Sequence, residues 1–142
     1  MNIKNTILST AKKTIELESS AIANLANLLT DDFADAVELI YKSKGRVIIT
    51  GIGKSAIIAN KIVATLNSTG TPAVFMHAAD AIHGDLGLIL QDDVVICISK
   101  SGNTPEIKVL VPLIKNANNK MIAITGNTTS FLGLQADYIL NT

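Results

Sequence analysis

Val94–Glu106, with the sequence VVICISKSGNTPE, contains the pattern that decides the fold. Its first five residues are apolar without alternation, which is typical of a strand buried on both faces of a parallel sheet. Thr104-Pro105-Glu106 then begins a helix, because Thr suits the N-cap, Pro the first helical position and Glu the positive end of the helix dipole. Three hydroxyls, a lysine and a glycine lie between strand and helix, beside free backbone N–H groups. Such a turn is typical of an anion site, and phosphate is the commonest anion bound there.

The same order of strand, polar turn and helix recurs on both sides of this stretch. Strands alternating with helices predict an α/β domain with a parallel sheet and right-handed crossovers. Polar turns at 51–55, 99–104 and 125–130 each follow a strand, so we expect them to meet at the carboxyl edge of the sheet, where doubly wound folds bind ligands. Apolar runs predict the other strands at Arg46–Thr50, Pro72–Met76 (near an edge, because of Pro72), Met121–Thr125 and from Tyr138 onward.

Two helices are predicted before the sheet. Asn2–Leu29 has apolar residues at helical spacing, and we expect this stripe to cover the sheet or another subunit. Asp31 or Asp32 is expected to cap a second helix, which Gly45 would end as the C′ residue. The segment 77–90 is expected to be irregular. We therefore predict a single domain over 1–142, with N-terminal helices in 1–44 and a βα core in 45–142.

The composition excludes several classes of protein. Lysine plus arginine and aspartate plus glutamate both number 12, so the basic excess of a nucleic-acid or membrane-surface binder is missing. The N-terminus is polar and no apolar run approaches membrane-spanning length, which predicts neither a signal peptide nor a membrane partner. Cys97 is the one cysteine, and we expect it to be a buried thiol in a reducing cytoplasm.

The turn GIGKSA at 51–56 partly matches two nucleotide-binding patterns. A P-loop needs a glycine where Ile48 stands, which argues against ATP or GTP hydrolysis. The spacing GxGxxA does match the dinucleotide fingerprint, but Met76-His77 stands where an acidic ribose-binding residue is needed. Two interpretations stay open. The glycines could serve a tight turn alone, or Lys54 and Ser55 could meet a small anionic ligand at the start of the helix.

The hydroxyls of 99–104 exceed what helix capping requires. One hydroxyl is enough for a cap, so three of them favour a bound phosphate, although capping alone is the alternative. The set Thr125, Asn127 and Thr128 is weaker, because Asn, Gly and Thr are common in ordinary turns.

His77 and His83, with Asp80 and Asp85 nearby, raise the question of a metal site. Their spacing lacks the i, i+4 pairing of a helical metal site, so we predict no metal and no other cofactor. His83 is better explained as a proton-handling or sugar-binding residue near the cleft, because imidazole titrates near neutrality. A purely structural role for His83 is the alternative.

Five segments together resemble a known family. GIGKS (51–55), TLNSTGTP (65–72), HGDLG (83–87), SKSGNTPE (99–106) and ITGN (124–127) occur in the order and spacing of the SIS (sugar isomerase) domain. The chain is most similar to the bacterial arabinose-5-phosphate isomerases, and the similarity covers nearly its whole length. This resemblance implies a three-layer, flavodoxin-like doubly wound sheet. It also implies reversible conversion of D-ribulose 5-phosphate into D-arabinose 5-phosphate through an enediolate.

The resemblance also implies roles for individual residues. Lys54, Glu106 and His83 match family positions linked to catalysis. The implied substrate-binding residues are Gly53, Ser55, Ser99, Lys100, Ser101, Gly102, Asn103 and Thr104. The chemistry is consistent, because an enediolate needs a base that moves a proton between adjacent carbons and a cation beside the developing oxyanion.

The family further implies a homo-oligomer, either a dimer or a tetramer, since small SIS domains build their sites between subunits. The family continues beyond Thr142 with further site residues, so we expect this chain to be a truncated piece that binds sugar phosphate with little or no turnover. The alternative function is a non-catalytic sugar-phosphate sensor, because SIS domains also occur in transcriptional regulators.

Overall fold

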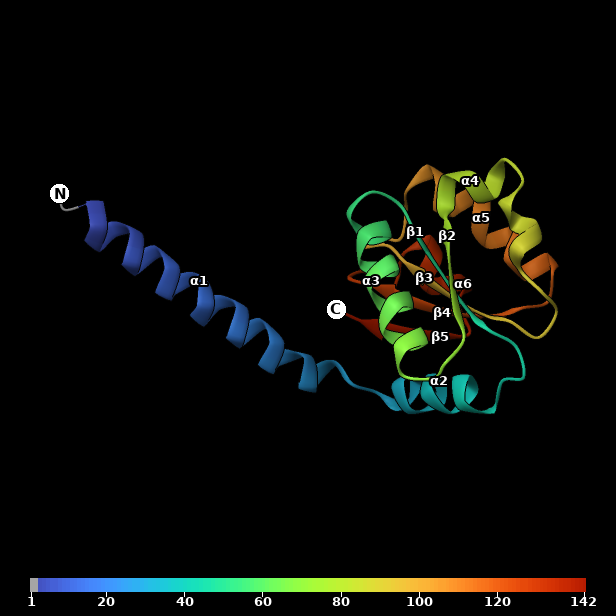
Figure 1. The fold of residues 1–142 in the computed structure, drawn as a ribbon, viewed down its shortest axis with the longest axis horizontal. Coiled ribbons are helices and arrows are strands. Elements are labelled where there is room, and N and C mark those ends of the chain that lie inside the picture. Colours follow the sequence, from blue (N-terminus) through green and yellow to red (C-terminus); the bar gives the residue numbers. More distant parts are fainter. Residues whose placement is uncertain (1–2) are drawn as a thin grey trace.

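The predicted strands form one sheet in which all neighbouring pairs are parallel (Figure 1). The structure is a computed structural model, and it describes residues 3–142. The strand order is β2-β1-β3-β4-β5, which is the order of flavodoxin-like doubly wound sheets. The strands are β1 (Val47–Gly51), β2 (Ala73–His77), β3 (Val94–Ile98), β4 (Lys120–Thr125) and β5 (Tyr138–Asn141).

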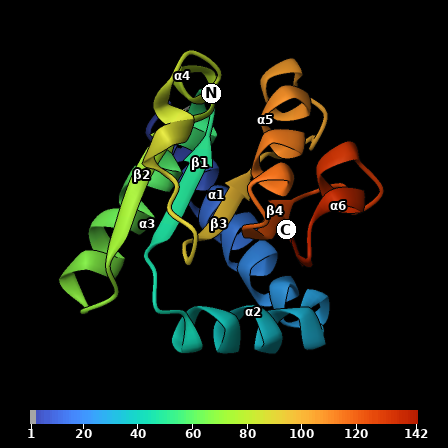
Figure 2. The same ribbon diagram turned by 90° about the vertical axis from the view of Figure 1, so that its right-hand side faces the viewer.

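Helices connect the strands and cover both faces of the sheet (Figures 1 and 2). The face that carries Ile48, Val95 and Cys97 packs against α4, α5 and α6. The face that carries Val47 and Ile96 packs against α2 and α3, which completes a three-layer α/β fold. The helices are α1 (Ile3–Leu25), α2 (Asp31–Lys42), α3 (Lys54–Ser68), α4 (Ala78–Ile82), α5 (Pro105–Asn116) and α6 (Phe131–Gln135), with short 3-10 helices η1 (Ala26–Leu28) and η2 (Asp85–Leu88).

The central strands confirm the prediction made from the apolar runs. All five residues of β1 and all five of β3 are buried. Pro72 directly precedes β2, and β2 is an edge strand as expected. Cys97 is fully buried in the middle of β3, and burial raises the pKa of its thiol to about 12. The sulfur is therefore a small core group without thiolate reactivity.

The first helix does not cover the sheet, contrary to one of the two expectations for it. None of the described residues of α1 is buried, and the helix projects away from the domain (Figures 1 and 2). Other helices occupy both faces of the sheet, α2 and α3 on one and α4, α5 and α6 on the other. Asn2, the predicted first residue of this helix, lies outside the described residues.

The predicted cap of α2 is wrong. Thr30 occupies the N-cap position without a side-chain hydrogen bond, and Asp31 and Asp32 lie inside the first helical turn. The Asp32 side chain instead serves the sheet, because its Oδ2 accepts a hydrogen bond from the backbone N–H of Ile139 in β5 at 2.7 Å. Asp32 and Ile139 are far apart in the chain, so the local sequence pattern gave no indication of this contact and favoured a helix cap.

Gly45 does not end α2 as a C′ residue. The helix ends at Lys42 with Ser43 as its C-cap, so Gly45 comes one position too late. A Cβ atom on Gly45 would lie 2.2 Å from the carbonyl oxygen of Asp92, and glycine is therefore required for the close approach of these two backbones.

The segment 77–90 is more regular than expected. It contains the one-turn helices α4 and η2, and Ala78 and Ala81 of α4 are buried against the sheet. Alanine has the highest helix propensity and a small side chain, which explains the close packing of this short helix.

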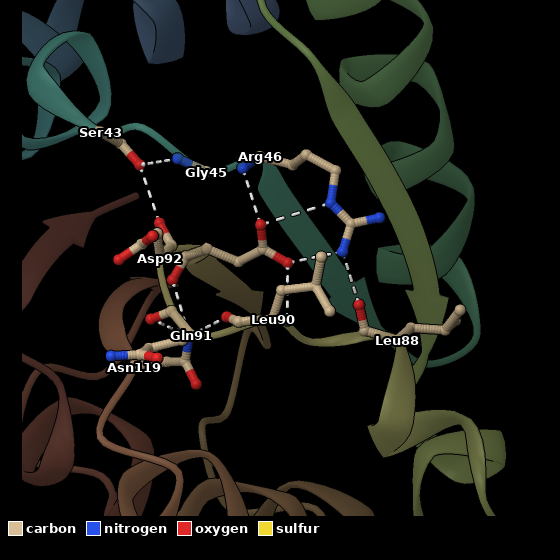
Figure 3. Close-up of polar contacts among 9 residues, drawn as sticks. Ser43, Gly45, Arg46, Leu88, Leu90, Gln91, Asp92 and Asn119 are labelled. Atoms are coloured by element: carbon tan, nitrogen blue, oxygen red, sulfur yellow. Dashed lines mark hydrogen bonds and ion pairs between the residues drawn. The ribbon is translucent and has the colours of Figure 1, made fainter.

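A hydrogen-bonded ion pair closes the amino edge of the sheet between β1 and β3 (Figure 3). Arg46 Nη2 lies 2.7 Å from Asp93 Oδ2 and 2.6 Å from the carbonyl oxygen of Leu88. The backbone N–H of Arg46 donates to Asp93 Oδ1 at 2.7 Å. Asn119 Nδ2 donates to the carbonyl oxygens of Leu90 at 2.8 Å and of Asp93 at 2.9 Å. We call Arg46, Asp93 and Asn119 the amino-edge network.

The carboxylate of this network is ionised under ordinary conditions. Burial raises the pKa of Asp93, but hydrogen bonds from the Arg46 side chain and from the backbone N–H groups of Leu90 and Arg46 outweigh this effect. The pKa of Asp93 therefore lies below its usual value.

Candidate functional site

The polar turns lie at the carboxyl edge, as the order of strands and helices predicted. The turn after β1 contains Ile52 and Gly53 and leads directly into Lys54, and the turn after β3 contains Ser99 to Thr104. Gly51 and Ile98 are register partners at the ends of these two strands, so the turns begin side by side. The β1/β3 pair is also the point where the chain reverses the direction of winding, which is where flavodoxin-like folds bind ligands.

Hydrogen bonds within the turn after β3 fix its shape. Ser99 Oγ accepts from the backbone N–H of Gly102 at 3.1 Å, and Ser101 Oγ accepts from the N–H of Asn103 at 3.3 Å. Asn103 Oδ1 in turn accepts from the N–H of Phe131 in α6 at 3.0 Å. Ser99 is buried while Ser101 is exposed, so the two hydroxyls lie at different depths of the same turn.

Gly102 is held in a conformation that other residues rarely adopt. Its φ is +64°, and an added Cβ would lie 1.9 Å from Ser130 Oγ. The carbonyl oxygen of Gly102 accepts from the N–H of Leu132 at 3.0 Å. The turn after β3 therefore rests on the start of α6, which Ser130 caps by accepting from the N–H of Gly133.

The turn after β4 has a structural role that accounts for its own polar residues. Thr125 Oγ1 accepts from the N–H of Asn127 at 3.2 Å, and Asn127 Oδ1 accepts from the N–H and the hydroxyl of Thr129. These bonds support the ordinary-turn interpretation of the set Thr125, Asn127 and Thr128.

Three unpaired polar atoms lie on the carboxyl side of the sheet. Among residues 3–142, three buried side-chain polar atoms have no hydrogen-bond partner: Thr50 Oγ1, His77 Nδ1 and Thr104 Oγ1. Thr50 and His77 lie in the last two positions of β1 and β2, and Thr104 is the N-cap residue of α5. Thr50 shares its sheet face with Ile48 and Cys97, whereas His77 shares the opposite face with Phe75. Buried polar groups are almost always paired, so each unpaired atom is one that a ligand or bound water would satisfy.

Thr104 occupies the predicted N-cap position but makes no capping bond. Its side chain accepts no hydrogen bond from the first turn of α5, and its Oγ1 atom is buried. Pro105 follows at the first helical position, as predicted. The hydroxyl of Thr104 and the N-terminal amides of α5 are thus available to an anion.

The turn after β1 has the close packing that its glycines predict. A Cβ on Gly51 would lie 3.0 Å from backbone and side-chain carbons of Ser55. Gly53 has a φ of +58° and is the N-cap residue of α3, so Lys54 and Ser55 open that helix. Lys54 is exposed and Ser55 is half-buried. The N–H of Ala56 donates to the carbonyl oxygen of Gly53 at 3.1 Å, so the N–H groups of Lys54 and Ser55 are the ones that lack an intrahelical acceptor.

Lys100 extends away from the turn that contains it. Its Nζ donates to the carbonyl oxygen of Thr142 at 2.8 Å. Its side chain crosses Gly126 so closely that a Cβ there would lie 2.5 Å from Nζ. Lys100 thus joins the ends of β3 and β5 in this structure.

The other predicted catalytic residues lie at separate places on the carboxyl side. Glu106 is half-buried in the first turn of α5, two residues after Thr104. His83 is the exposed C-cap residue of α4. In the described part of the chain, no hydrogen bond or ion pair joins His83 to Lys54 or Glu106, so the predicted catalytic side chains have no polar contact through His83 in this structure.

Sequence reasoning did not identify the buried, unpaired hydroxyl of Thr50, and it considered His77 only for a metal site. Thr50 is the one polar residue in the apolar run 47–50, and its place near the end of that run could have indicated a polar group at the carboxyl edge. His77 Nδ1 lies 3.8 Å from Asp80 Oδ2, and Gly51 is its register partner in β1. Within residues 3–142, no three His, Cys, Asp or Glu side chains lie together as a metal site would require. Over the same residues, no helix has the length and apolar character needed to cross a bilayer.

Comparisons with known proteins agree on one family. The model of the SIS domain matches residues 39–142. A probable arabinose 5-phosphate isomerase of Haemophilus influenzae is 46% identical over 134 residues, and an arabinose 5-phosphate isomerase of Pseudomonas aeruginosa is 47% identical over 134 residues. Each alignment covers 94% of this chain but only 40% and 41% of the relative, so the chain spans about two fifths of their length.

A solved structure is similar over the whole fold. A protein of Escherichia coli CFT073 in complex with arabinose 5-phosphate superposes with a TM-score of 0.93 at 37% sequence identity. The alignment covers 99% of this chain and 74% of that protein.

Proposed function

This chain belongs to the SIS domain family, and we propose that it forms the sugar-phosphate site of an isomerase that interconverts D-ribulose 5-phosphate and D-arabinose 5-phosphate. Its similarity to arabinose 5-phosphate isomerases and to a protein in complex with arabinose 5-phosphate supports this substrate. The observation that carries the proposal is the buried, unpaired hydroxyl of Thr104, which follows the polar turn after β3 at the start of α5.

The phosphate would lie against the turn after β3 and the start of α5. The Thr104 hydroxyl, the Ser101 hydroxyl and the N-terminal amides of α5 supply donors, and the bonds within the turn hold them in place before the ligand arrives. Ser55 and the first amides of α3 supply further donors from the neighbouring turn.

The isomerisation then needs a proton transfer between C1 and C2 of the sugar. A base removes a proton from C1 of the ketose, which gives an enediolate with its negative charge on the C2 oxygen. A second proton then moves from the C1 hydroxyl to the C2 oxygen, and the first proton returns to C2, which gives the aldose. Glu106 and His83 are the candidates for this base, and the Lys54 ammonium would stabilise the negative oxygen of the enediolate. No group from outside the protein is needed to balance this reaction.

The separation of the three catalytic candidates supports a site completed between subunits. His83 is exposed, and no hydrogen bond or ion pair within residues 3–142 links it to Lys54 or Glu106. We therefore propose a homo-oligomer, a dimer or a tetramer, in which a second copy faces the carboxyl edge. The cytoplasmic location remains a prediction from the sequence.

The test measures binding and turnover separately. Calorimetry of this chain with arabinose 5-phosphate should show binding that inorganic phosphate competes for, because the ester group carries the contact. NMR of the sugar should show its conversion to ribulose 5-phosphate by this chain or by a chimera extended with the C-terminal part of a curated relative. Binding without turnover in both proteins would favour the sensor, and absence of binding would refute the site.

A further inference from the structure

The turn after β3 caps the start of α6. The first N–H groups of a helix have no acceptor within the helix itself. In α6, the N–H of Phe131 donates to Oδ1 of Asn103 at 3.0 Å, and the N–H of Leu132 donates to the carbonyl oxygen of Gly102 at 3.0 Å. The third N–H is bound by Oγ of Ser130, the N-cap residue. Two of the first three N–H groups of α6 are therefore satisfied by the turn after β3.

The start of α5, which follows the same turn, is not capped in this way. Pro105 has no N–H, and the N–H groups of Glu106 and Ile107 have no acceptor among residues 3–142. The side chain of Thr104 makes no capping bond either. One turn thus completes the hydrogen bonding of α6 and leaves the donors of α5 free for a ligand.

The side chain of Asn103 is the part of the turn that reaches α6. Its Oδ1 accepts from Phe131, and its Nδ2 donates to the carbonyl oxygen of Ser101 at 3.2 Å. A backbone N–H can only donate and a carbonyl can only accept, so these two partners fix the orientation of the amide. An aspartate at this position would lack the donor, and an alanine would lack both groups.

Asn103 also holds Ser101 in place. The backbone N–H of Asn103 donates to Ser101 Oγ at 3.3 Å, while its side chain holds the Ser101 carbonyl. One residue thus fixes both the side chain and the backbone of Ser101. Because Ser101 Oγ is the acceptor in this bond, and its hydroxyl donates to no group in the described part of the chain, the hydroxyl hydrogen is left for a phosphate oxygen.

We propose that Asn103 is a positioning residue and not a ligand of the phosphate: it ties the turn after β3 to α6, and the tie holds the Ser101 hydroxyl in place before the ligand binds. Family resemblance implied direct substrate binding by Asn103, but both ends of its amide are already bonded within the protein. Without the tie, the turn must be ordered when the ligand arrives, which lowers affinity. The effect on the ligand rests on the proposed function, whereas the tie itself does not.

Hydrogen exchange of the Phe131 amide, followed by NMR, tests the tie without any sugar phosphate. Asn103→Ala removes the acceptor of this N–H, so its exchange should become at least tenfold faster. Asn103→Asp keeps an oxygen acceptor and should restore slow exchange. The matched control is Asn127→Ala, because Asn127 Oδ1 also accepts two hydrogen bonds, but both come from Thr129. The Phe131 rate should stay within twofold in this control. An unchanged rate in Asn103→Ala, or an equal rise in the control, overturns the proposal.

Calorimetry with arabinose 5-phosphate tests whether Asn103 acts through Ser101. Asn103→Ala alone should lower affinity at least fivefold, and Asn127→Ala should leave it unchanged. In a Ser101→Ala chain, the further loss caused by Asn103→Ala should be less than twofold, because the group that it positions is gone. Losses that multiply would make Asn103 a direct ligand, and unchanged affinity in Asn103→Ala would remove it from the site, so either result refutes the proposal.

Failure of the proposed function gives a different result. If the unchanged chain does not bind arabinose 5-phosphate, the proposed function fails and the effect of Asn103 on the ligand fails with it. The exchange rate of the Phe131 amide then still decides whether Asn103 ties the turn to α6, because that measurement contains no ligand.

Discussion

Buried polar groups are hydrogen-bonded at the amino edge of the sheet, whereas some of those at the carboxyl edge are not. At the amino edge, both carboxylate oxygens of Asp93 accept hydrogen bonds, and Asn119 Nδ2 donates to backbone carbonyls. At the carboxyl edge, Thr50 and Thr104 keep buried hydroxyls without partners. Completed hydrogen bonding serves the stability of the fold, whereas unfilled bonding capacity is what a ligand can use. Substitutions at the first edge should therefore change unfolding, and substitutions at the second should change binding and turnover.

The largest effect is expected from Asp93→Asn. This change leaves the Arg46 guanidinium, 31% exposed, without its carboxylate, and removing one partner of a buried pair costs about 3–5 kcal/mol of unfolding free energy. Urea unfolding followed by circular dichroism measures the loss. Asp92→Asn, at the exposed neighbouring position, should stay within about 0.5 kcal/mol of the unchanged protein. Equal stability of the two variants would contradict the role assigned to the amino edge.

Lys54→Ala should have the next largest effect, on turnover rather than on stability. Loss of a group that stabilises an oxyanion typically lowers kcat by about 100-fold, or about 2.7 kcal/mol. The measurement is the rate of arabinose 5-phosphate conversion by the extended protein. Lys61→Ala is the matched control, because Lys61 is an exposed lysine of the same helix. A loss of affinity at unchanged kcat would remove Lys54 from catalysis.

Ser101→Ala should weaken ligand binding. The hydroxyl of Ser101 is exposed at the turn after β3, and its loss leaves a phosphate oxygen without one donor, which costs about 1–3 kcal/mol. Calorimetry with arabinose 5-phosphate gives the change in affinity. The unfolding free energy is expected to change far less, and unchanged affinity would count against this turn as the phosphate site.

Thr104→Val should change ligand affinity while leaving the stability of the fold nearly unchanged, which is the clearest contrast with Asp93→Asn. Its Oγ1 is buried and makes no capping bond, so replacing the hydroxyl by a methyl group should leave the unfolding free energy within about 1 kcal/mol or raise it. Affinity for the sugar phosphate should fall, and Thr104→Ser should retain it. A large loss of stability in the valine variant would show that the hydroxyl serves the fold.

The smallest effect is a change in the acid dependence of stability. The folded pKa of Asp93 is lowered, so its stabilising contribution is complete above the unfolded pKa of about 3.9 and is lost as the pH falls through the folded pKa. Urea midpoints measured from pH 6 to pH 2 should therefore fall less steeply in Asp93→Asn than in the unchanged protein. Parallel curves would contradict the lowered pKa.

The fold was predictable because its evidence is local. The unbroken apolar run of β3, the turn that follows and Pro105 at the first position of α5 define a strand and a helix without any knowledge of the tertiary structure. The recurrence of that order then predicts a parallel sheet and puts the turns at one edge.

The wrong predictions concern residues whose contacts are with residues far away in the chain. Gly45 approaches Asp92, and Asp32 accepts from Ile139, so neither role leaves a local pattern. The exposed apolar residues of α1 predict a packing partner for this helix but do not identify it. The contact of Lys100 Nζ with the carbonyl oxygen of Thr142 likewise joins residues far apart in the chain, and its predicted role in substrate binding stays a prediction.

The hydrogen bond between Asp32 and Ile139 has a consequence for how copies of this chain can associate. β5 is the last strand of the sheet, and an open strand edge is a template on which other chains can add β-structure and aggregate. A carboxylate from α2 occupies one of its backbone donors, at 2.7 Å. Growth of the sheet from one molecule into the next is thereby discouraged on this side, which leaves helix surfaces as the safer means of self-recognition.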